Sequence, residues 1–148
     1  MKEWPEFNEH GDLPLGIYQA TLAEVIEHFG HGSLQRQHAA QRLERIYDLA
    51  SSTGHLARFI VYGSFVTAKP NPNDVDVFLL MEDSFEPANV KGEAAVILDH
   101  MTTHNRLGAS VFWTTRRGAL RGEQAAIEDW QYKRDETKRG IVEVISRD

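Results

Sequence analysis

The chain has 148 residues, of which 41% are hydrophobic and 26% are charged, a composition typical of one folded domain rather than a disordered segment. It contains no cysteine, which excludes a disulfide framework and a thiolate metal site. Its formal net charge of -6 argues against a protein that coats a long nucleic-acid template, and no apolar run approaches the roughly 20 residues that span a membrane.

The N-terminal residues 1–20 are rich in Pro and Gly and predict an irregular arm without the apolar core of a signal peptide. We therefore expect a single domain over residues 1–148, located in the cytoplasm, with no membrane contact.

Two helices are expected next in the chain. Thr21 and Glu24 have the spacing of a capping box, and Gly30 follows a short apolar face, which predicts a helix over "TLAEVIEHF". A second helix is expected over roughly Ser33 to Ser52. The side chains expected to face inward from this helix are Leu34, Leu43, Ile46, Tyr47 and Ala50.

The remainder of the chain alternates between strand and helix patterns. Four segments rich in apolar and β-branched residues predict strands: "LARFIVYG", "DVDVFLLM", "GASVFWTT" and "GIVEVIS". Helices are expected around Glu93 to Met101 and around Glu123 to Tyr132. This order predicts an α/β (α+β) fold, a mixed β-sheet of about four strands with helices packed on it.

The segment "YGSFVTAKPNPNDVDVFLLME" contains the candidate site. Asp74 and Asp76 open an apolar strand, ten and twelve residues after Ser64, and alternate strand residues point to the same face. Two carboxylates held this close repel each other unless a cation lies between them or one is protonated. The pair is thus either a cation site or a solvated strand end that follows a turn.

Hard cations such as Mg²⁺ prefer oxygen ligands and keep positions open for phosphates. Gly63 has no Cβ and would let a ligand approach the backbone, while Ser64 offers a hydroxyl and an N–H. If the following "SFVTAK" forms a helical turn, its free N–H groups would favour a phosphate.

These residues resemble the signature of the polymerase-β-type nucleotidyltransferase superfamily: Gly-Ser, a variable loop, then Asp-x-Asp entering an apolar strand. "GDLPLGIYQATLAEVIEHFG" together with "GSFVTAKPNPNDVDV" is also similar to a family of small bacterial proteins placed in that superfamily. The resemblance implies that Gly63 and Ser64 hold nucleotide phosphates. It also implies that Asp74 and Asp76 are catalytic and bind Mg²⁺ or Mn²⁺, with two ions in an active enzyme.

The chain departs from the superfamily pattern at the third carboxylate, which members usually carry on the strand after the intervening helix. Ser110 is expected at that position, and a serine is a poor base at neutral pH. Glu143 would replace the missing acid if the last strand lies beside the third, and otherwise would be an exposed edge-strand residue. Asp99, on the preceding helix, is expected to face solvent.

Two functions are therefore considered. The first is a metal-dependent enzyme that transfers a nucleotidyl group from a nucleoside triphosphate to a hydroxyl on a protein, an RNA end or a small molecule. The second is a non-catalytic module of the same fold that binds nucleotide or a partner protein. The resemblance implies a protein partner under either function, in a toxin–antitoxin or phage-defence pair. A site with only two acids would favour the second function.

Overall fold

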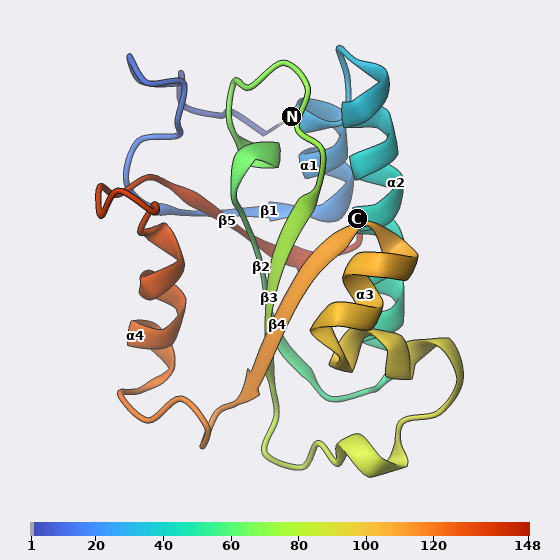
Figure 1. Cartoon of the computed structure of the whole chain (residues 1–148). Coiled ribbons are helices and arrows are strands. Elements are labelled where there is room, and N and C mark those ends of the chain that lie inside the picture. The colour runs from blue at the N-terminus through green and yellow to red at the C-terminus, as the bar shows by residue number, and fades with distance from the viewer. Residues whose placement is uncertain (1) are drawn as a thin grey trace.

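The computed structural model describes residues 2–148 and shows one mixed sheet with helices on both of its faces (Figure 1). The helices α1, α2 and α3 lie on one side of the sheet, and α4 lies on the other. None of the helices within residues 2–148 is both long enough and apolar enough to span a membrane.

The five strands are β1 (Ile17–Thr21), β2 (Leu56–Tyr62), β3 (Val75–Met81), β4 (Ala109–Thr115) and β5 (Ile141–Ser146). The α-helices are α1 (Leu22–Phe29), α2 (Leu34–Ser52), α3 (His100–Leu107) and α4 (Glu123–Glu128). Short 3₁₀ helices cover Ser64–Val66, Pro87–Asn89, Gly92–Leu98 and Asp129–Gln131.

The two predicted N-terminal helices are confirmed, and local capping explains where they begin. The Thr21 hydroxyl accepts a hydrogen bond from the Glu24 N–H at 3.1 Å, and the Glu24 carboxylate accepts one from the Thr21 N–H at 2.8 Å. The Ser33 hydroxyl caps α2 by accepting from the Arg36 N–H at 3.1 Å. Leu34, expected to be buried, is 62% exposed because it lies at the first position of α2.

The sheet has five strands rather than about four, in the order β1-β5-β2-β3-β4. The additional strand is β1, which lies in the segment expected to be an irregular arm. It pairs in parallel with β5, from Ile17 opposite Ile141 to Thr21 opposite Ser146. Its five residues carry too little alternation to predict a strand, and pairing with β5, 124 residues away, forms it.

The predicted helix over residues 93–101 is also wrong in detail. A 3₁₀ helix covers Gly92–Leu98, and α3 begins as a separate helix at His100. The Asp99 carboxylate accepts a hydrogen bond from the Thr102 N–H at 3.1 Å, so this residue caps α3 instead of continuing a helix through it. The last predicted helix is shorter than expected, since α4 ends at Glu128 and a 3₁₀ turn follows.

Both faces of the central strands are buried. Phe59 and Val61 of β2 join the large core beneath α1, α2 and α3, while Ile60 between them joins a smaller core beneath α4. On β3, Val77 faces the large core and Phe78 the smaller one. By the same alternation, the side chains of Asp74 and Asp76 lie on the α4 face.

Candidate functional site

Asp76 lies directly against the bend at Gly63. The antiparallel register of β2 and β3 places Asp76 opposite Tyr62, the residue before Gly63. Gly63 has a φ of +81°, and a Cβ built there would lie 2.0 Å from Oδ2 of Asp76. Any side chain at position 63 would occupy the place of the Asp76 carboxylate. Asp76 and the bend at Gly63 therefore belong to one site.

The environment of the Asp76 carboxyl raises its pKa. The pKa of the Asp76 carboxyl is raised above its ordinary value, first by burial and then by the negative charge of Asp74. Hydrogen bonding to Ser110 and the charges of Arg139 and Arg134 oppose this increase without cancelling it. Burial and the charge of Asp76 also raise the pKa of the neighbouring Tyr62 hydroxyl. Burial and the neighbouring like charge therefore disfavour the charged form of Asp76.

Ser110 lies where the third carboxylate was expected. The parallel register of β3 and β4 pairs Asp76 with Ser110, so the Ser110 side chain lies beside the Asp76 carboxylate. Ser110 was expected on the strand beside the two aspartates, and β4 lies next to β3. Its side chain brings a hydroxyl to Asp74 and Asp76 instead of a carboxylate.

Glu143 does not replace the missing acid, and neither expectation for it is correct. Its strand, β5, lies between β1 and β2 rather than beside β4, and the residue is only 7% exposed. Its carboxylate accepts hydrogen bonds from Arg58, at 2.7 Å from Nε and 2.8 Å from Nη2. Asp99 is exposed, as expected, and caps α3. Across residues 2–148, no group of three or more His, Asp or Glu side chains lies suitably placed to hold a metal ion.

A buried arginine holds the chain that follows the Gly-Ser bend. Arg36 of α2 is 8% exposed, and its guanidinium donates to the carbonyls of Phe65 at 2.9 Å and Lys69 at 2.6 Å. It also donates to the carbonyls of Phe29 and Thr67. The four carbonyls replace a carboxylate partner and fix the loop between the bend and β3.

Sequence reasoning missed Arg36, although a signal was present. Arg36 precedes Ala39, Ala40 and Leu43 by three, four and seven residues, the spacing of the buried face of α2. A cation on an apolar stripe indicates a buried hydrogen-bonding role, but its partners could not be named from the sequence.

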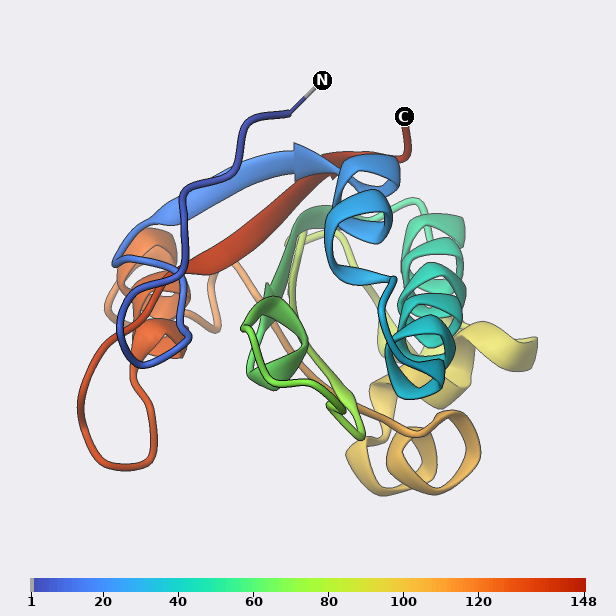
Figure 2. The ribbon, with the colours of Figure 1, turned by 90° about the horizontal axis from the view of Figure 1, so that it is seen from above.

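Three segments that are distant in sequence meet near Asp74 and Asp76, which we call the acid pair. Asp12 of the N-terminal arm is 5% exposed and binds Lys133 at 2.9 Å and Arg139 at 3.2 Å. The Gly11 carbonyl next to it accepts from the Ala68 N–H at 2.8 Å. Seen from above, the loop before β5 lies near α4, away from α2 and α3 (Figure 2). The arm runs from α1, where the Trp4 ring stacks on His28, to this loop. This arrangement brings Arg134 and Arg139 close enough to act on Asp76.

One family model matches residues 5–145 of the chain, and its description is "Family of unknown function (DUF6932)". No curated protein and no solved structure gives a significant match. Because the matched region covers nearly all of the sequence, the chain belongs to the DUF6932 family.

Proposed function

We propose that the chain binds a nucleoside triphosphate together with a divalent cation on a nucleotidyltransferase-like fold. The observation that carries this proposal is the contact between the Asp76 carboxylate and the bare backbone of Gly63. This contact supports the proposal because a carboxylate suited to a cation lies against a backbone bend that has no Cβ.

The acid pair fits a divalent cation. Asp74 and Asp76 supply oxygen ligands, and a bound cation would offset the burial and the Asp74 charge that together raise the pKa of Asp76. Mg²⁺ or Mn²⁺ bound to these oxygens would neutralise charge on the phosphates and polarise the phosphorus under attack.

The protein groups around the pair suit a triphosphate. Gly63 permits close approach of the backbone, and the hydroxyl of Ser64 lies at the same bend. Arg134 and Arg139 supply positive charge near Asp76. Arg36 maintains the loop geometry through its four carbonyl contacts.

Nucleotidyl transfer is the reaction that we assign to this site. A hydroxyl oxygen of the acceptor bonds to the α-phosphorus, and the bond from that phosphorus to the oxygen bridging to the β-phosphate breaks. Pyrophosphate leaves, and the proton of the hydroxyl passes to water. The acceptor is a protein side chain, an RNA end or a small molecule.

A second candidate is a binding module that holds nucleotide, or a partner protein, without transfer. Ser110 favours it, because residue 110 faces Asp76 and adds no charge. A partner in a toxin–antitoxin or phage-defence pair belongs to this candidate as well as to the first.

Calorimetric titration with each nucleoside triphosphate, with and without Mg²⁺ or Mn²⁺, tests the binding proposal. We expect the double substitution Asp74→Asn and Asp76→Asn to abolish cation-dependent binding while the fold persists. A matched control is Asp83→Asn with Glu86→Gln, which removes the same charge from exposed positions beyond the other end of β3. Undiminished binding by the Asp74/Asp76 variant would refute the proposal.

Incubation with α-labelled nucleoside triphosphates separates the two candidates. Label transferred to protein, RNA or a small hydroxyl compound, and lost in the Asp74/Asp76 variant, would support the enzyme. Nucleotide binding without label transfer to any of the three acceptor classes would support the binding module.

A further inference from the structure

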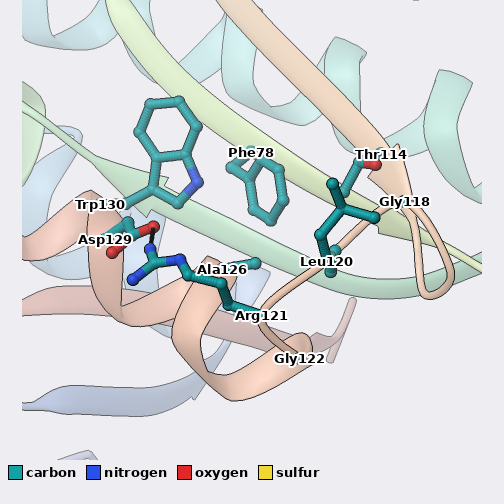
Figure 3. Close-up of a pocket in the computed structure, with 10 residues that line it drawn as sticks. Phe78, Thr114, Gly118, Leu120, Arg121, Gly122, Ala126, Asp129 and Trp130 are labelled. Carbon is teal, nitrogen blue, oxygen red and sulfur yellow. Dashed lines mark hydrogen bonds and ion pairs between the residues drawn. The ribbon is translucent and has the colours of Figure 1, made fainter.

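A hollow of about 510 Å³ lies on the same face of the sheet as the acid pair, between the end of β4 and α4 (Figure 3). Its walls are mainly apolar. Its lining residues include Phe78, Thr114, Leu120, Arg121, Ala126 and Trp130. Arg121 and Asp129 form an ion pair at its rim. An apolar hollow with a few polar groups at one side is the usual form of a small-molecule site.

Aromatic rings connect this hollow with the acid pair. Phe78 follows Asp76 by two residues, so its side chain lies on the same face about 7 Å further along β3. The Trp130 ring lies 5.2 Å from the Phe78 ring and 4.5 Å from the Tyr62 ring. Because Tyr62 pairs with Asp76, the rings form one wall that runs from the acids into the hollow.

Apolar surface remains exposed along this wall. Leu120, at the rim, is 94% exposed. Phe112 is 41% exposed, although it stacks on Trp130 at 5.5 Å and on His100 at 4.3 Å. A flat ring entering beside these residues would bury apolar area and could stack on an aromatic face.

We propose that this hollow receives the base of the bound nucleotide, while the phosphates lie at Gly63, Ser64 and the acid pair. The assignment of the phosphate half rests on the function proposed above. The aromatic rings of Tyr62, Trp130 and Phe78, which connect the acids with the hollow, favour a base over another occupant, because a base stacks on aromatic faces. Arg121 and Asp129 offer a donor and an acceptor to the edge of the base.

The two halves of the site can be tested separately with partial ligands. Adenosine, guanosine, cytidine and uridine probe the hollow, and inorganic triphosphate with Mn²⁺ probes the acid pair. Ala126→Phe fills the hollow from α4, and Gln124→Phe adds the same ring to an exposed position of the same helix. By calorimetry we expect Ala126→Phe to weaken nucleoside binding at least tenfold and to leave triphosphate binding unchanged. Gln124→Phe should change neither.

Leu120→Ser provides a second variant whose folding is not at risk, because the side chain is almost fully exposed. It should weaken nucleoside binding several-fold. The proposal is overturned if no nucleoside binds the natural protein, or if nucleosides bind equally to all variants. Nucleoside binding that survives Asp74→Asn with Asp76→Asn would support the hollow as a base site. If triphosphate fails to bind while nucleosides do, the function proposed above fails and the base site stands.

Discussion

Gly63 and Asp76 share a space that a side chain at position 63 would fill. Replacing Gly63 by alanine adds two costs: a backbone φ of +81°, and a Cβ 2.0 Å from the Asp76 carboxylate. Gly54 has a similar φ of +76° with no atom within 4 Å of the added Cβ. Gly54→Ala therefore carries the backbone cost alone, about 1 kcal/mol.

We expect Gly63→Ala to lower the free energy of unfolding by about 2–4 kcal/mol, more than Gly54→Ala does, because the clash adds to the backbone cost. Urea unfolding of both variants measures the difference. Equal losses in the two variants would show that Asp76 moves aside freely.

Ser110→Asp should increase the affinity of the acid pair for Mn²⁺, since residue 110 is paired with Asp76 across β3 and β4. An added carboxylate that joins the ligands should strengthen binding by about tenfold, or 1.4 kcal/mol. Thr114→Asp places the same charge four residues further along β4 and should have little effect. Calorimetric titration with Mn²⁺ alone measures both affinities. Equal affinities of the two variants would count against a position of residue 110 among the cation ligands.

At the scale of elements, α2 and the loop after Gly63 are joined through Arg36. Replacing it by methionine leaves buried carbonyls without their donor and should lower the free energy of unfolding by about 3 kcal/mol. Arg42 of the same helix is half-buried against Gly108, and its hydrogen bond to the Asn73 carbonyl, at 3.1 Å, is exposed. Arg42→Met should therefore cost at most about 0.5 kcal/mol.

Hydrogen exchange gives a second measure of Arg36. The amides of residues 65–69 should exchange faster in Arg36→Met than in Arg42→Met, because the guanidinium no longer holds that loop. Unchanged exchange there would mean that the loop holds its shape without the arginine.

For the whole molecule, Asp76 and Glu143 should affect the pH dependence of stability with opposite signs. Burial and Asp74 raise the pKa of Asp76 above 3.8, so its contribution to stability is present at acidic pH and is lost as pH rises through the folded-state pKa. Asparagine does not titrate, so Asp76→Asn removes this loss of stability with rising pH. The variant should gain stability relative to the natural protein as pH rises from about 4 through the raised pKa of Asp76.

Glu143 behaves in the reverse way, because its hydrogen bond to Arg58 lowers its pKa below 4.5. Its contribution to stability is present above pH 4.5 and is lost as pH falls through the lowered pKa. Glu143→Gln should cost about 1–3 kcal/mol at pH 7, and the difference should shrink in acid. Thermal unfolding of both variants from pH 3 to 8 would contradict these assignments if their differences from the natural protein changed with pH in the same direction.

Features that depend on neighbouring residues could be predicted from the sequence. Caps such as Thr21 with Glu24, and Ser33 with Arg36, are local hydrogen bonds, so their spacing predicted where α1 and α2 begin. The apolar runs predicted β2 to β5 because strand periodicity is local as well. The distance between the Gly-Ser bend and the two aspartates also indicated where the candidate site lies.

Contacts between residues far apart in the chain became clear only from the folded structure. The strand β1 forms because it pairs with β5. Glu143 binds Arg58 because β5 lies next to β2. The link from Asp12 to the loop before β5, and the hollow beneath α4, likewise depend on packing. Such contacts depend on how the strands are ordered in the sheet, which the local pattern of side chains does not encode.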